Sequence, residues 1–192
     1  VDDSSYGILF NYVTYSDIRG NEVRDITGER DLPGKTIEGG EGKALFVYNS
    51  EFNEIHMNLL ADSSIGIHIT AGSESNHIYE NVFLDNRTQV KYVQNVAEEW
   101  SLHGVGNYWS NYLGWDLNGD GIGDVPYRPN DGVDVLLWTY PSARVLMSSP
   151  SVWLMRYVQR AFPVFTPPSV QDSHPLMKIP NNLRARADEQ RH

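Results

Sequence analysis

The chain has 192 residues, no cysteine and a formal net charge of -10. Without thiols it can form neither a disulfide framework nor a thiolate metal site, and its acidic body argues against nucleic acid as a partner. No apolar run is long enough for a membrane span. The charge is uneven, because basic residues outnumber acidic ones after residue 143. A basic tail beside apolar residues favours a membrane surface or a partner protein.

Three segments align without gaps and indicate an internal repeat: Tyr6–Val23, Lys43–Leu60 and Gly66–Phe83. The last two copies are 23 residues apart, and the first keeps this step if part of the stretch between Arg24 and Gly42 loops out. Repeats of this length indicate stacked units, none of which buries its apolar face alone. The aligned columns are Ile18, Ile55 and Ile78; Asn21, Asn58 and Asn81; Leu9, Phe46 and Ile69; and Val23, Leu60 and Phe83.

Within each copy, apolar and polar residues alternate in short runs bounded by Gly, Asn, Ser or Asp, which is strand periodicity. We predict an all-β fold, a right-handed parallel β-helix of about four coils over residues 1–105, which we expect to continue upstream of Val1. The asparagine column predicts a ladder of side-chain amides at one corner. The alternative is that these asparagines are only turn residues. Leucine-rich repeats are disfavoured because their leucine frame is missing.

Coil four is weaker. Val90 and Tyr92 match Ile67 and Ile69, but Ser101 replaces the column isoleucine, as in a terminal coil. Residues 106–147 are predicted to form a cap over the end of the rod. Its aromatic residues predict a hydrophobic lid, with a sugar-stacking platform as the alternative; they are Tyr108, Trp109, Tyr112 and Trp115.

A loop rich in Asp and Gly follows the lid. Its oxygen side chains occupy positions 1, 3, 5 and 9 of an EF-hand-type loop, with Gly at position 6. The predicted calcium ligands are Asp116, Asn118, Asp120, the Ile122 carbonyl and Asp124. Tyr127 replaces the bidentate Glu at position 12, so a further ligand would come from Asp131 or Asp134. The alternative is a turn whose carboxylates accept backbone N–H groups.

The coils, the segment Gly106–Pro129, Leu137–Pro141 and Arg160–Phe165 resemble the NosD family. The resemblance covers nearly the whole chain and matches the C-terminal part of these proteins. It implies a periplasmic accessory protein without catalytic activity, which takes part in copper maturation of nitrous oxide reductase. The implied partners are an ABC-type membrane subunit with its ATPase, a copper chaperone lipoprotein and the apo reductase, so the protein would lie peripherally at the inner membrane.

Residues 148–192 are predicted to be a docking element. Ser149 is the expected N-cap and Pro150 the first residue of a helix that covers Val152–Phe162. Its apolar face could dock to a membrane subunit, lie at the lipid interface or pack on the rod. The docking residues are Trp153, Leu154, Tyr157, Val158, Phe162 and Phe165. The Pro-rich stretch from Pro163 to Pro180 predicts an extended arm, and Asn181–His192 is predicted to be disordered without a partner.

Copper(I) prefers Met and His ligands when Cys is absent. The candidates are His56, Met57, His68 and His77, with Met147 and Met155 in the tail. His56 and His77 flank buried column isoleucines, so both are expected to point outward and could share a diagonal site. The alternative is that these histidines are simply solvated.

Enzymatic β-helices are the rival class, because lyases and glycosidases use the same rod. Glycosidases need paired carboxylates, and lyases need calcium beside a basic residue. Glu54, Glu74 and Glu80 are isolated in the register, while Arg87 and Lys91 lack an acidic cage. We therefore expect no catalytic residues and keep carbohydrate binding or polysaccharide processing as the alternative function.

Overall fold

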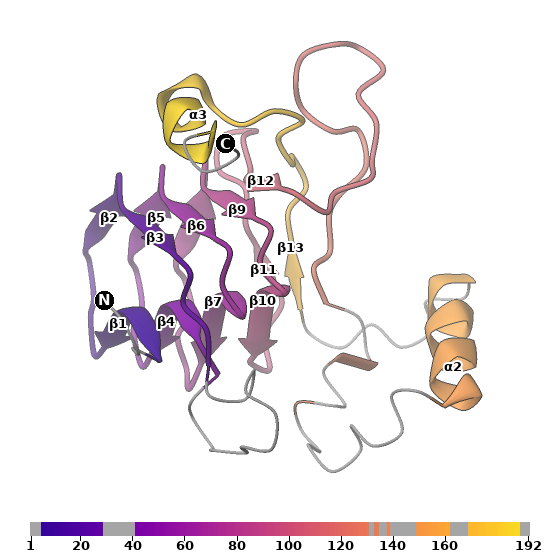
Figure 1. The fold of residues 1–192 in the computed structure, drawn as a ribbon, viewed down its shortest axis with the longest axis horizontal. Helices are drawn as coiled ribbons and strands as arrows, with labels where there is room; N and C mark the ends of the chain where they lie inside the picture. Colours follow the sequence, from indigo (N-terminus) through magenta and orange to yellow (C-terminus); the bar gives the residue numbers. More distant parts are fainter. Residues whose placement is uncertain are drawn as a thin grey trace.

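The computed structural model describes residues 5–28, 41–130, 133–134, 138, 149–161 and 169–188. Within these ranges the chain forms a rod of parallel strands stacked coil upon coil (Figure 1). One sheet has the order β1 (Tyr6–Asn11), β4 (Lys43–Tyr48), β7 (Ile65–Thr70), β10 (Thr88–Val93). A second has β2 (Asp17–Arg19), β5 (Glu54–His56), β8 (His77–Tyr79). The third has β3 (Glu22–Arg24), β6 (Leu59–Ala61), β9 (Val82–Leu84), β12 (Tyr108–Trp109). The predicted parallel β-helix is confirmed.

The first sheet corrects one predicted column. Phe46 of β4 pairs with His68 of β7, whereas Val47 pairs with Ile69. The chain therefore advances by 22 residues from β4 to β7, but by 23 from β5 to β8, where Ile55 pairs with Ile78. Because successive strand residues point to opposite faces, this one-residue shift decides which side chains enter the core. The extra residue is taken up in the corner between β7 and β8.

The predicted asparagine ladder is confirmed and is longer than expected. The Asn21 amide donates to Asn58 Oδ1 (2.9 Å), Asn58 to Asn81 Oδ1 (3.0 Å) and Asn81 to Asn107 Oδ1 (3.0 Å). Asn107 escaped the alignment because it lies 26 residues after Asn81. At a neighbouring corner position Met57 has a φ of +53°, so the chain turns through left-handed geometry there. The side chains on this corner satisfy backbone groups that the turn leaves unpaired.

The core of the rod is made by inward side chains of all three sheets. It contains Phe10, Leu45, Val47, Ile55, Leu60, Ile67, Ile69, Ile78, Phe83, Val90 and Tyr92. Trp100 and Trp109 close this core at the end of coil four, and Trp109 stacks on Phe83 with ring centroids 4.3 Å apart. The predicted lid is therefore correct for Trp109 and wrong for Trp115, whose side chain is 56% exposed. Trp115 lies in a loop that leaves the rod, beyond the reach of the core.

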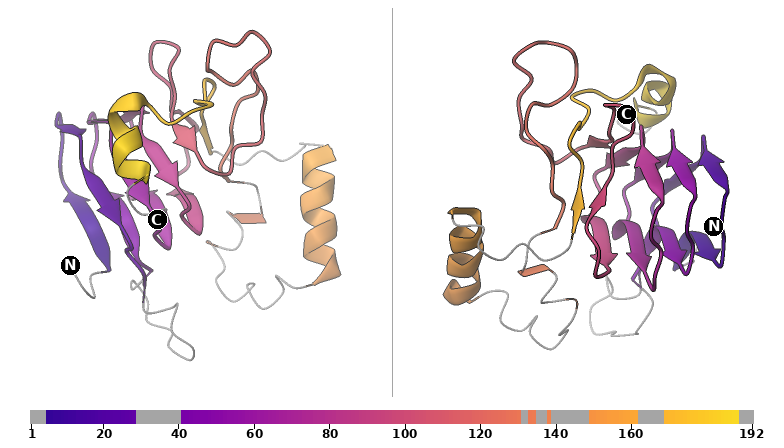
Figure 2. Two further views of the ribbon diagram at one scale, coloured as in Figure 1. Left: turned by 45° about the horizontal axis from the view of Figure 1, so that its top comes forward. Right: turned by 180° about the vertical axis from the view of Figure 1, so that it is seen from behind.

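The chain returns to the end of the rod at residues 169–177, called here the return segment. Within it, β13 (Val170–Gln171) pairs in parallel with β11 (Glu98–Glu99). Leu176 then forms a parallel bridge with Tyr108 of β12. The return segment thus stacks on coil four as a further partial coil (Figure 2, yellow-orange trace beside β11 and β12). Of the predicted arm, residues 169–177 are described, and they pair with coil four and with the loop.

Helix α3 (Asn181–Asp188) corrects the prediction of disorder for this stretch. Leu183 and Ala187 are buried against residues of β6 and β9, so α3 covers the outer face of the third sheet (Figure 1). The Arg186 guanidinium also donates to the Gly20 carbonyl (2.9 Å). Leu183 and Ala187 are too few, in a mainly polar segment, to show a helical periodicity, so the sequence did not predict this packing.

Helix α2 (Pro150–Ala161) confirms the predicted helix. Ser149 caps it as expected: its Oγ accepts the Ser151 N–H (3.1 Å), and Pro150 is the first helical residue. In both views of Figure 2, α2 stands beside the end of the rod and away from its sheets.

Candidate functional site

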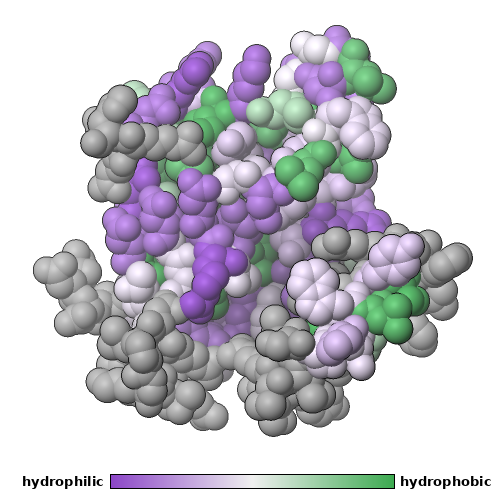
Figure 3. All heavy atoms as spheres, turned by 45° about the vertical axis from the view of Figure 1, so that its right-hand side comes forward, coloured by the Kyte–Doolittle hydropathy of each residue, from purple (hydrophilic) through white to green (hydrophobic). Residues whose placement is uncertain are grey.

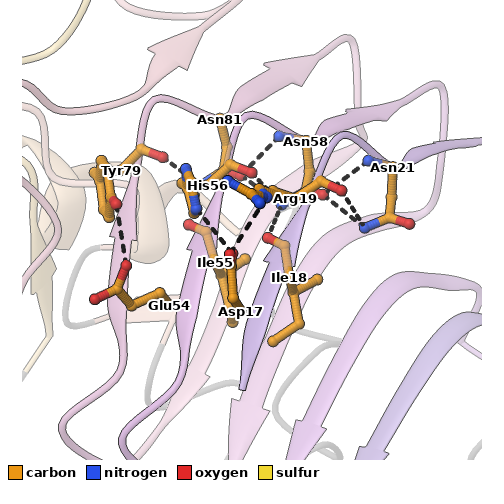
Figure 4. Close-up of polar contacts among 10 residues, drawn as sticks. All are labelled: Asp17, Ile18, Arg19, Asn21, Glu54, Ile55, His56, Asn58, Tyr79 and Asn81. Atoms are coloured by element: carbon orange, nitrogen blue, oxygen red, sulfur yellow. Dashed lines mark hydrogen bonds and ion pairs between the residues drawn. The ribbon is translucent and has the colours of Figure 1, made fainter. Parts of the chain in front are cut away.

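The outer face of β2, β5 and β8 carries a network of polar side chains (Figure 4). His56 Nε2 lies 2.9 Å from Asp17 Oδ1, and the Asp17 carboxylate also pairs with Arg19 (3.3 Å). The His56 ring stacks on Tyr79, with centroids 5.0 Å apart, and is only 7% exposed. Tyr79 in turn donates its hydroxyl to Glu54 (3.3 Å).

These contacts decide how the predicted histidines lie. His77 is exposed on β8, where it pairs in register with Glu54 of β5. Asp17, the partner of His56, lies on β2, which pairs with the other edge of β5. The Nε2 atom of His56 points to Asp17 on β2 (Figure 4), whereas His77 lies on β8, on the other side of β5. The shared diagonal copper site stays a prediction, and the contacts of His56 do not favour it. Met57 is half-buried at the corner, outside the core.

His68 lies on a different sheet, in an electropositive setting. It stacks on Phe46 (4.9 Å), and its Nδ1 atom is buried without a hydrogen-bond partner. Burial, together with the charges of Lys91 and Lys43, lowers the pKa of His68 to about 3. Its imidazole is therefore neutral at ordinary pH, which suits a ligand, but the two nearby ammonium groups oppose a cation.

Glu41 offsets these lysines. Its carboxylate lies 2.6 Å from the Lys91 ammonium and 3.6 Å from that of Lys43. Burial alone would raise the pKa of Glu41, but the hydrogen bond and charge of Lys91, helped by Lys43, lower it to about 2. The group is a partly buried ion cluster and stabilises the outer face of β4, β7 and β10.

Across the part of the chain that the structure describes, no three His, Asp or Glu side chains converge as a metal site would require. Among the copper candidates, His56 contacts Asp17 and Tyr79, while His68 lies on another sheet beside Phe46. Met147, Phe162, Phe165 and Asp131 lie outside the described residues.

The Asp/Gly loop is held by its own backbone amides. Asp116 accepts the Gly119 N–H (2.7 Å) and the Gly121 N–H (2.9 Å), and Asp124 accepts the Leu117 N–H (2.7 Å). Asp120 accepts the Ile122 N–H (2.8 Å). These bonds fit the alternative of an Asp/Gly turn. The predicted calcium ligands have no further support from this geometry, and calcium binding stays a prediction.

Helix α2 presents the predicted docking face to the exterior. Trp153 is 73% exposed, Leu154 62% and Tyr157 71%. Val158 and Met155 are also exposed on this helix. In Figure 3 pale and green side chains gather over α2, on the side of the molecule turned toward the reader. A helix that leaves this many large apolar side chains in water is typical of a binding surface.

Comparison with known proteins settles the family. The family model described as "Periplasmic copper-binding protein (NosD)" matches residues 1–114. The chain belongs to the NosD family. It is 60% identical, over 93% of its length, to a "Probable ABC transporter binding protein NosD" from Stutzerimonas stutzeri. A protein of the same description from Pseudomonas aeruginosa is 57% identical over 94% of the chain. The resemblance predicted from the repeat, the lid and the tail is confirmed.

The chain spans 41% and 42% of the length of these two NosD relatives. Their descriptions are those of binding proteins rather than enzymes, and the family description places its members in the periplasm. In the described ranges of this chain, no helix has both the length and the apolar character needed to cross a membrane.

Sequence reasoning missed Asp172, the most enclosed carboxylate at the end of the rod. Asp172 is fully buried, and its Oδ2 accepts the Asn107 N–H (2.7 Å) and the Trp109 indole N–H (2.8 Å). Asp172 lies within the Pro-rich stretch from Pro163 to Pro180, which carried no pattern to mark it. The only available signal was an acidic residue in a basic tail.

Proposed function

We propose that this chain is part of a non-catalytic periplasmic accessory protein that docks onto an ABC-type membrane complex and takes part in delivering copper to apo nitrous oxide reductase. The exposed apolar face of α2 carries the docking part of this proposal. The roles in copper delivery and in transporter docking are supported by the description of the family as copper-binding and of its relatives as ABC transporter binding proteins. The protein would then be held at the inner membrane by its partners.

Docking through α2 is favoured over packing on the rod because the apolar face lies in water and the helix stands away from the sheets (Figure 2). Trp153, Leu154 and Tyr157 would bury large apolar areas against a membrane subunit, and such aromatic anchors dominate interface energies. The lipid interface is the other occupant considered for this face.

The docking test is co-purification with the membrane subunit and its ATPase. A Leu154→Ser/Tyr157→Ser/Val158→Ser variant should lose the complex while keeping the circular dichroism of the wild type. Leu113→Ser/Leu117→Ser serves as the matched control, because these side chains are 93% and 84% exposed in the loop. Retention of the complex by the α2 variant would rule out docking through α2.

For copper, we propose transient binding of copper(I) at His77 with the remaining ligands supplied by the partner, such as the chaperone lipoprotein. His77 is exposed, whereas His56 is engaged with Asp17 and His68 is buried beside two lysines. Copper(I) transfer from the chaperone, followed with a chromophoric competitor, should weaken in His77→Gln and persist in His68→Gln. Equal transfer in all variants would place the ligands elsewhere.

For the Asp/Gly loop, calcium binding through Asp116, Asn118, Asp120, the Ile122 carbonyl and Asp124 stays a proposal. Calorimetric titration of a chelated sample tests it, with Asp120→Ala as the variant that should abolish the heat. Absence of heat and of a thermal shift in the wild type would leave the loop as a plain turn.

A further inference from the structure

The return segment is clamped between two parts of the chain that precede it. On one side it pairs with coil four, where the Trp100 N–H donates to the Gln171 carbonyl (2.7 Å) and the Leu176 N–H to the Asn107 carbonyl (2.9 Å). On the other side it holds the loop, because Asp172 and Tyr127 exchange backbone bonds of 2.8 and 2.9 Å. The Gly123 N–H also donates to the Pro175 carbonyl (2.8 Å).

Asp172 is the point where these contacts meet. Besides the Asn107 and Trp109 bonds, its Oδ1 accepts the His174 N–H (3.1 Å). Because the Asn107 side chain accepts from Asn81, the carboxylate also stands at the end of the asparagine ladder. Gly106 fits against it so closely that a Cβ at this position would lie 1.8 Å from Asp172 Oδ1. Asp172 therefore fixes the position of the return segment on the rod.

The return segment has little apolar anchorage of its own. Val170 and Pro175 are its buried apolar side chains among the described residues, and its central group is a buried carboxylate. A buried charge costs free energy that its hydrogen bonds only offset. The coils, by contrast, are held by inward Ile, Leu and Val side chains throughout. Closure of the return segment should therefore be less stable than the coils on which it stacks.

Helix α2 lies on the stretch of chain between the two clamped parts. Before α2, the Asn130 amide donates to the Val90 carbonyl of β10 (2.7 Å), so the chain still contacts coil four there. After α2, the return segment is the first part of the chain that the structure describes. A load on the C-terminal end of α2 would therefore act on the return segment first.

We propose that the return segment is a releasable latch, closed by Asp172, that opens together with the Asp/Gly loop while the coils stay folded. This inference rests on the contacts at the rod end and does not require that α2 docks to any particular partner. Opening would uncover the edges of β11 and β12 and lengthen the tether of α2. The latch would thus couple a load on α2 to the end of the rod.

Hydrogen exchange measured by mass spectrometry on the full chain tests the latch. In Asp172→Asn, residues 98–109, 121–127 and 169–177 should exchange at least tenfold faster than in the wild type, all three together, while residues 43–70 keep their protection. Gly106→Ala should give the same pattern by displacing the carboxylate without removing it. Asp188→Asn is the control, because Asp188 is exposed on α3 and should leave exchange at the rod end unchanged.

A disulfide gives the second test, since the chain has no native cysteine. Glu99 and Gln171 are register partners on β11 and β13, a spacing that a disulfide can span. In Glu99→Cys/Gln171→Cys, oxidation should restore the protection of residues 121–127 relative to the same protein in its reduced form. Three results would overturn the latch: faster exchange limited to residues 172–174, equally faster exchange in residues 43–70, or no difference between oxidised and reduced protein.

Discussion

At the scale of single residues, Asn81 shows how one side chain holds two coils. Its amide donates to the Ile55 and Tyr79 carbonyls and to Asn107, while its oxygen accepts from Asn58. Asn81→Ala should lower the free energy of unfolding by roughly 3 kcal/mol, because several buried partners lose their bonds at once. Urea denaturation followed by circular dichroism measures this loss.

The matched control for Asn81 is Asn21→Ala, at the first rung of the ladder. Asn21 is only half-buried and donates to Asn58, while its side-chain oxygen accepts from no described neighbour. Its loss should cost about 1 kcal/mol, the value of one or two partly exposed bonds. Equal costs for the two variants would contradict a ladder whose interior rungs matter most.

The second residue-scale prediction concerns pH. Burial raises the pKa of Asp172 to about 6, against the hydrogen bonds that stabilise its ionised form. Because the pKa of Asp172 is higher in the folded than in the unfolded chain, folding favours the protonated, neutral side chain. The stability that Asp172 confers is therefore complete below pH 4, falls between pH 4 and 6, and is lost above pH 6. The shift corresponds to about 3 kcal/mol.

Urea unfolding at pH 4, 5, 6 and 7 checks this sign. The free energy of unfolding of the wild type should fall with rising pH relative to that of Asp172→Asn, whose amide does not titrate. A difference between the two proteins that stays constant across this range would mean that Asp172 has no raised pKa in the fold.

At the scale of elements, α3 packs on the rod through two apolar side chains. Leu183 and Ala187 are each 2% exposed and pack on β6 and β9. Leu183→Ala should cost about 2 kcal/mol, the lower end for a buried leucine, because a terminal helix can undock and relax. Arg184→Ala, on the exposed side of the helix, should cost less than about 0.5 kcal/mol. Thermal unfolding with faster amide exchange over residues 181–188 would verify undocking.

At the scale of the whole molecule, the rod behaves as a one-dimensional stack in which each coil contacts its neighbours. Asn21 and Asp172 stand at opposite ends of the ladder, about 19 Å apart if four strand spacings separate them. The double variant Asn21→Ala/Asp172→Asn should therefore lose the sum of the two single losses, within about 0.5 kcal/mol. A larger coupling in this double-mutant cycle would mean that the ladder transmits strain along the rod.

The sequence alone determined the features that depend on local periodicity. The recurrence of Ile55 at Ile78 and of Asn58 at Asn81 sufficed for the parallel β-helix and its ladder, because stacked coils bring residues 23 apart into register. Ser149 and Pro150 likewise specified where α2 begins. These signals lie within one or two repeats of the residues they position.

Tertiary structure decided what no repeat encodes. The pairing of Phe46 with His68 depends on one extra residue in the corner between β7 and β8. An alignment without gaps cannot show such a residue. Asp172 reaches Asn107 across 65 residues, and α3 packs through only two apolar side chains. Each of these contacts occurs once and joins segments of unlike sequence, so no repeated pattern predicts it. Its free energy comes from burial and hydrogen bonds that form only when the chain has folded back on its rod.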